Sequence, residues 1–83
     1  MSKKLSEIIK LEGLDKMQPI TIMYRTWAPD ESDILSGYCK YEDGKIISLD
    51  GDNYSLNDKF VKHELRTIDG EPMLIVWYES EWI

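Results

Sequence analysis

The 83-residue chain is long enough for one domain with one modest core, and its 42% of apolar residues predict a folded protein. Sixteen acidic against ten basic residues give a formal charge of −6, which argues against direct binding to nucleic-acid phosphates. The sequence contains no run of about 20 apolar residues of the kind that spans a bilayer, so no membrane contact is expected.

Cys39 is the only cysteine, so an intrachain disulfide is impossible and a reducing compartment is favoured. Two lysines near the N-terminus are followed by an acidic amphipathic segment instead of the apolar core of a signal peptide. We therefore expect a cytoplasmic protein that consists of a single domain over residues 1–83.

The first predicted element is a short helix over residues 3–12. Ser2 is a suitable N-cap, and Gly13 fits the left-handed position that commonly follows a helix. Three apolar side chains fall on one helical face, namely Leu5, Ile8 and Ile9. A helix of this length does not persist alone, so we expect it to pack on a sheet.

A strand is predicted over residues 20–27, and a polar loop follows it from Ala28 to Asp33. The strand carries apolar side chains on both faces, because Ile20 and Ile22 alternate with positions that include Met23. This pattern predicts burial on one side and a second contact, an interface, on the other.

The stretch from Ile34 to Leu56 is predicted to form a hairpin around Asp43-Gly44. Asp-Gly supplies the positive φ angles that a two-residue type I′ turn requires. Counting outward gives five facing pairs: Glu42 with Lys45, Tyr41 with Ile46, Lys40 with Ile47, Cys39 with Ser48, and Tyr38 with Leu49.

A second hairpin is predicted to join residues 60–68 to residues 71–79 through Asp69-Gly70. One side, which we expect in the core, pairs Leu65 with Leu74, His63 with Val76, and Val61 with Tyr78. The other side pairs Arg66 with Met73, Glu64 with Ile75, and Lys62 with Trp77. We interpret this second side as a partly covered surface, because the aliphatic stems of charged side chains lie beside large apolar side chains.

The order of elements predicts an α+β fold that is mainly antiparallel β. We expect the short N-terminal helix to be followed by a four- to five-stranded bent sheet or by a small SH3- or Sm-like barrel. The segment GYCKYEDGKIISL resembles the glycine-containing second and third strands of Sm-like small β-barrels, and this resemblance implies topology alone. The chain lacks the paired Asp/Asn loops and the basic face with which Sm-like proteins bind RNA.

No residue pattern predicts a catalytic site, a metal ion or a cofactor. Cys39 and His63 are the only thiol and the only imidazole, but the predicted registers place both at packing positions. The acidic residues Asp50, Asp52 and Asp58 do not fit a calcium loop, because Tyr54 and Ser55 occupy its fifth and sixth positions. Turn formation explains these acids better.

The aromatic and basic residues suggest two kinds of surface. Trp77 faces Lys62, and the same region holds the only dense basic group, formed by Lys59, Lys62, His63 and Arg66. A tryptophan face beside cations can stack a base while the cations hold phosphates. We favour a subunit or partner interface over such a nucleotide-binding surface, and we therefore expect a homo-oligomer. The interface residues are predicted to be Met23, Trp27, Ile75 and Trp82.

The stretches DILSGYCKYEDGKIISLDGDNYSL and IVWYESEW resemble small proteins encoded by phages and prophages of Gram-positive bacteria. This resemblance implies a non-enzymatic accessory protein that inhibits host defence in the host cytoplasm. Its partner is then a small nucleotide or a host defence protein. The leading hypothesis is an oligomeric sponge that sequesters a nucleotide immune signal. The alternatives are an acidic nucleic-acid mimic that inhibits a host nuclease, as anti-CRISPR proteins do, and a structural oligomer.

Overall fold

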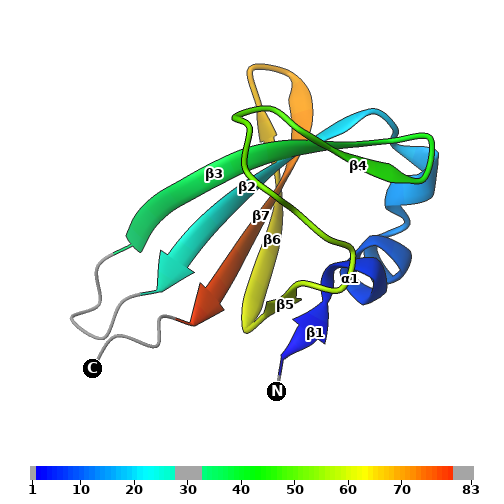
Figure 1. Ribbon diagram of the computed structural model, residues 1–83. Coiled ribbons are helices and arrows are strands. Elements are labelled where there is room, and N and C mark those ends of the chain that lie inside the picture. The colour runs from blue at the N-terminus through cyan, green and yellow to red at the C-terminus, as the bar shows by residue number, and fades with distance from the viewer. Residues whose placement is uncertain (1, 28–32, 80–83) are drawn as a thin grey trace.

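A computed structural model describes residues 2–27 and 33–79, which form a five-stranded sheet with a short helix beside it (Figure 1). The elements in chain order are β1 (Lys3–Lys4), α1 (Leu5–Glu12), the 3₁₀ helix η1 (Leu14–Lys16), β2 (Ile20–Trp27), β3 (Asp33–Glu42), β4 (Lys45–Ser48), β5 (Lys59–Phe60), β6 (Lys62–Ile68) and β7 (Glu71–Glu79). This arrangement confirms the mainly antiparallel α+β fold expected from the sequence.

The strands of the main sheet are ordered β4-β3-β2-β7-β6. Neighbours are antiparallel except for β2 and β7, which run parallel at the centre. Of the two expected forms, the structure has the open sheet and not the closed barrel, because its edge strands β4 and β6 do not pair. After β4 the described chain leaves the sheet and crosses toward α1 (Figure 1). There the carbonyls of Leu56 and Asp58 accept hydrogen bonds from the first turn of the helix.

Both predicted hairpin turns are confirmed. Asp43 and Gly44 have φ angles of 54° and 74°, and Asp69 and Gly70 have φ angles of 52° and 80°. The facing pairs counted from Asp43-Gly44 form as predicted from Glu42 with Lys45 to Cys39 with Ser48. The pairs counted from Asp69-Gly70 form from Arg66 with Met73 to Lys62 with Trp77.

The predicted strand over residues 60–68 is instead broken at Val61. The Val61 N–H donates to the carbonyl of Trp77 at 2.9 Å, and the predicted pairing of Val61 with Tyr78 is absent from the register. The break separates β6 from the two-residue strand β5, which pairs with β1. It also lets Phe60 enter the core, where its side chain is 2% exposed.

The helix begins two residues later than predicted, at Leu5, with Lys4 and not Ser2 as its N-cap. Tertiary contacts explain the difference, because Lys3 and Lys4 pair with β5 as a short strand. The N–H groups of Leu5 and Ser6 donate to main-chain carbonyls of residues 56–58, so no capping side chain is needed. The helix ends as predicted at Gly13, which has a φ of 66°.

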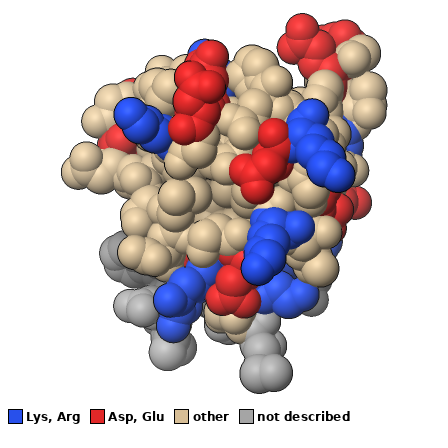
Figure 2. Space-filling view, turned by 90° about the vertical axis from the view of Figure 1, so that its right-hand side faces the viewer, with Lys and Arg blue, Asp and Glu red and all other residues tan. Residues whose placement is uncertain are grey.

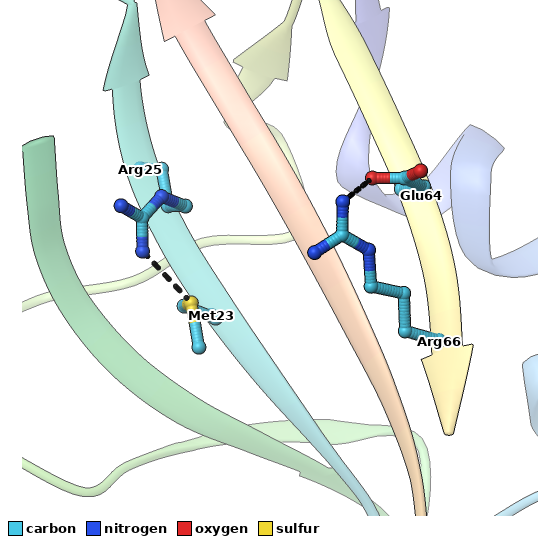
Figure 3. Close-up of polar contacts among 4 residues, drawn as sticks. All are labelled: Met23, Arg25, Glu64 and Arg66. Atoms are coloured by element: carbon cyan, nitrogen blue, oxygen red, sulfur yellow. Dashed lines mark hydrogen bonds and ion pairs between the residues drawn. The ribbon is translucent and has the colours of Figure 1, made fainter. Parts of the chain in front are cut away.

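The sheet has two faces, which we call the helix side and the open face. One apolar cluster fills the helix side and consists of Leu5, Ile8, Ile9, Leu14, Ile20, Ile22, Tyr24, Cys39, Tyr41, Phe60, Leu74 and Val76. On the open face, Ile75 and Trp77 of β7, which lies between β2 and β6, are only 2% and 4% exposed. Figure 3 shows two pairs flanking this strand, Met23 with Arg25 on β2 and Glu64 with Arg66 on β6.

Candidate functional site

A pocket of about 460 Å³ lies on the helix side, where the segment between β4 and β5 crosses the sheet. Four of its lining residues are aromatic: Tyr24 from β2, Tyr54 from the crossing segment, Phe60 from β5 and Tyr78 from β7. Two carboxylates, Asp52 and Asp58, also line it. The remaining lining residues are Ser36, Asn53 and Lys59. The pocket is therefore built by segments that are far apart in the sequence.

The aromatic rings of the pocket pack edge-to-face around the ring of Tyr24. Its ring centre lies 4.6 Å from that of Tyr54, 5.0 Å from that of Phe60 and 6.5 Å from that of Tyr78. The planes meet at 64°, 90° and 64° respectively, which is the edge-to-face geometry that aromatic pairs favour. The buried rings of Tyr24 and Phe60 form the base of this group, and Tyr54 and Tyr78 are half-buried.

Hydrogen bonds fix the base of the pocket. The Tyr24 hydroxyl donates to Oδ2 of Asp58 at 2.9 Å, and the Ser55 N–H donates to the same oxygen at 2.9 Å. Burial, reinforced by the hydrogen bond to Asp58, raises the pKa of Tyr24. The hydroxyl therefore stays protonated at neutral pH and serves as a hydrogen-bond donor, not as a base.

Asp50 holds the crossing segment against β3. Its carboxylate accepts hydrogen bonds from the Tyr38 N–H at 3.0 Å, from the Asp52 N–H at 3.1 Å and from the Tyr54 hydroxyl at 2.5 Å. These contacts, first among them that from Tyr54, lower the pKa of Asp50 to about 2. The sequence-based explanation of Asp50 by turn formation agrees with these bonds.

Gly37 leaves space for the side chain of Tyr54, which lies against its main chain. A Cβ atom at this position would lie 1.9 Å from the Tyr54 hydroxyl oxygen and 2.6 Å from Oδ2 of Asp50. The bond between Tyr54 and Asp50 thus passes directly over the glycine, which faces Tyr24 in the sheet. Glycine inside a strand commonly marks such a close approach.

Replacing Asp50 with asparagine is expected to remove part of the acid sensitivity of the fold. A carboxyl whose pKa is depressed to about 2 stabilises the fold above its unfolded pKa and loses this effect as pH falls to about 2. The difference in Tm between wild type and Asp50→Asn should be largest at pH 5 and shrink between about pH 4 and pH 2. Thermal unfolding followed by circular dichroism measures it. A difference that is constant over this range would contradict the assigned role.

The five residues predicted to bind a ligand do not form one site. Lys62 lies on the open face with its Nζ 4.7 Å from the centre of the Trp77 ring. Arg66, on the same face, donates to Glu64 at 2.6 Å. His63 lies on the helix side, because neighbouring residues of a strand point to opposite faces. Its Nε2 is 3.0 Å from Oε1 of Glu12. Lys59 lines the pocket from β5, beyond the break at Val61.

Of the residues predicted to form an interface, Met23 and Ile75 lie side by side on the open face, at paired positions of β2 and β7. Ile75 is 2% exposed, so its side chain is not available to a partner at the surface of the chain. Met23 is half-buried beside Arg25, and Trp27 ends β2 with its side chain outside the described atoms. Trp82 lies outside the described residues. Among those described, the exposed large apolar residues are Leu11, Leu35, Ile47, Leu49, Val61, Leu65 and Ile68.

Cys39 and His63 are placed apart by the sheet. Cys39 is on β3 and His63 is on β6, and strands β2 and β7 lie between them, which separates them by roughly 14 Å at the usual strand spacing. Cys39 is fully buried, and burial raises the pKa of its thiol to about 12. This thiol is a packing group, as the sequence indicated.

Two further features of residues 2–27 and 33–79 bear on site chemistry. No helix in these ranges is long and apolar enough to cross a membrane. Nor do these ranges bring together three His, Cys, Asp or Glu side chains in a group that could hold a metal ion. On the side of the molecule shown in Figure 2, acidic and basic residues are interspersed, so this side has no extended surface of one sign.

Sequence reasoning did not identify the pocket. It assigned Tyr78 to the core and Asp58 to a turn, and it singled out no role for Tyr24, Tyr54 or Phe60 as site residues. The available signal was Gly37, a glycine inside a strand and opposite a tyrosine, which indicates that another group approaches the backbone. Which group approaches could not be read from local sequence.

Comparison of the chain with protein-family models, with curated proteins and with solved structures finds no match.

Proposed function

We propose that the protein is a non-enzymatic binding protein whose ligand occupies the pocket on the helix side of the sheet. The observation that carries this proposal is the pocket itself, with about 460 Å³ of space and four aromatic residues around it. This volume lies within the range of about 300–1,000 Å³ that is usual for small-molecule sites. Among the described residues, four aromatic and five polar side chains line it, so it offers both apolar contact and hydrogen-bonding groups to a ligand.

The chemistry of the lining residues supports binding without turnover. The pocket contains neither the thiol of Cys39 nor the imidazole of His63. Burial raises the pKa values of Tyr24 and Tyr54, with a further contribution from their carboxylate partners, so both hydroxyls remain donors. Two hydrogen bonds to one oxygen of Asp58 hold its carboxylate in place, so this carboxylate provides a fixed negative charge in the pocket lining.

The nucleotide-sponge hypothesis would use the other face of the sheet. There the Trp77 ring is 4% exposed and Lys62 lies over it, so a base could stack only after Lys62 moved. Among the described residues, the pocket lining has two carboxylates and one lysine, which disfavours phosphates. We therefore retain binding as the function and propose the pocket as the site. The phage context and the homo-oligomer stay predictions.

A fragment titration followed by two-dimensional NMR tests this proposal. Small cationic, neutral and anionic compounds are added to labelled protein, and we expect a subset to shift the amide signals of Asn53, Tyr54 and Tyr78. These compounds should be recovered chemically unchanged. Tyr78→Ala should abolish the shifts, whereas Lys62→Ala, on the open face, should preserve them. Shifts confined to the surroundings of Trp77, or none with any compound, would refute the proposal.

A further inference from the structure

We infer that the pocket binds an alkylammonium group, an inference that rests on the proposed function and specifies its ligand. The aromatic lining provides the first argument. An aromatic ring carries negative charge density on its faces, and several rings around one space attract a cation strongly when water is excluded. Tyr54 and Tyr78 are half-buried and therefore keep ring surface accessible to a ligand, and the buried rings of Tyr24 and Phe60 pack edge-to-face and tilted against them.

The charges provide the second argument. Asp52 and Asp58 contribute two negative charges to the lining, and Lys59 on β5 is its one cation among the described residues. Asp50 adds a third carboxylate next to the pocket, since it accepts the hydroxyl hydrogen bond of Tyr54. The chain as a whole carries a charge of −6, so the surrounding field also attracts cations.

The hydrogen-bonding pattern favours an N-methylated ammonium. Oδ2 of Asp58 already accepts hydrogen bonds from Tyr24 and Ser55, and Oδ2 of Asp50 accepts those from Tyr38 and Tyr54. These oxygens therefore act mainly through their charge. A quaternary ammonium needs negative potential and apolar contact but has no N–H group to donate, and this matches aromatic rings beside the hydrogen-bonded oxygens of Asp50 and Asp58.

Calorimetry with a matched ligand pair tests the inference. Choline and 3,3-dimethylbutan-1-ol have nearly the same shape, but only choline is charged. We expect choline to bind about tenfold more tightly than the alcohol, a difference of about 1.4 kcal/mol that lies between exposed and desolvated cation–π interactions. Equal affinity, or tighter binding of the alcohol, would overturn the inference. In that case the proposed function would still stand, because a ligand would occupy the pocket.

A pair of charge variants tests the role of the carboxylates. Asp58→Asn keeps an oxygen that can accept from Tyr24 and removes the charge, so it should weaken choline binding about tenfold and leave the alcohol unaffected. Asp69→Asn is the matched control, because it makes the same change in net charge at an exposed turn. Equal weakening by both variants would show a general field effect and contradict a local ammonium site.

A third set of titrations distinguishes the sources of the ammonium group. Choline presents it as a free small molecule, and a short peptide with N-trimethylated lysine presents it on a protein side chain. Similar affinities for both would support recognition of the head group alone, and tighter binding of the peptide would support a modified protein as the source. If neither binds but other neutral or anionic fragments occupy the pocket, the inference is wrong and the proposed function is kept. If no compound binds at all, both are wrong.

Discussion

Truncation of Trp77 to alanine is expected to lower the free energy of unfolding by about 3–5 kcal/mol, the range for large aromatic residues buried in a core. Trp77 is 4% exposed in the middle of the sheet, with Lys62 over its ring. A surface platform for a nucleotide base would behave differently, because exposed residues change stability by no more than about 0.5 kcal/mol. Urea unfolding followed by circular dichroism measures the effect.

Two further variants make the Trp77 experiment decisive. Trp77→Phe retains most of the buried apolar surface and should cost markedly less than Trp77→Ala. Lys62→Ala removes the cation over the ring and should cost about 1 kcal/mol or less. If Trp77→Ala is as stable as wild type, Trp77 does not belong to a buried layer on the open face. In that case the hypothesis that a nucleotide base stacks on Trp77 would be favoured again.

Replacement of Gly37 with alanine is expected to cost about 1–3 kcal/mol of stability and to disrupt the pocket wall. The new methyl group would lie 1.9 Å from the Tyr54 hydroxyl oxygen, so Tyr54 and Asp50 must separate or shift. The main-chain angles of Gly37 are not the obstacle, because its φ is not positive. The cost should come from the displaced tyrosine, and ligand binding should fall with stability.

A double-mutant cycle with Tyr54→Phe isolates this contact. Phenylalanine lacks the hydroxyl group that the methyl would strike, so Gly37→Ala should be less costly in the Tyr54→Phe background. A coupling energy of about 0.5–3 kcal/mol is expected for groups in direct contact. The ring atom next to the hydroxyl would still lie 3.1 Å from the methyl, so some cost should remain. Strictly additive effects would mean that Tyr54 does not lie over Gly37.

The parts of the fold that the sequence predicted are those encoded locally. Each Asp-Gly pair requires positive φ angles and thereby sets the register of its hairpin, and this register followed by counting residues. The end of the helix at Gly13 was predictable for the same reason, because one residue type suits one conformation. The facing of Lys62 and Trp77 also followed from counting.

The parts that could not be predicted depend on contacts between distant segments. The parallel pairing of β2 with β7 joins residues about fifty positions apart and has no local signature. The break at Val61 is set by the pairing of β5 with β1, and the start of α1 is set by carbonyls of the crossing segment. The pocket combines residues of β2, β5, β7 and that segment, so it appears only once the whole chain is placed.

We have proposed that a cation binds beside the aromatic rings of the pocket on the helix side of the sheet. An isotope-filtered NMR experiment on the protein with choline tests it most directly, because it detects magnetisation transfer from the N-methyl protons to protein protons within about 5 Å. We expect transfer to the ring protons of Tyr54 and Tyr78, on the helix side. Transfer to Trp77 on the open face, or none to any aromatic ring at saturating choline, would contradict it.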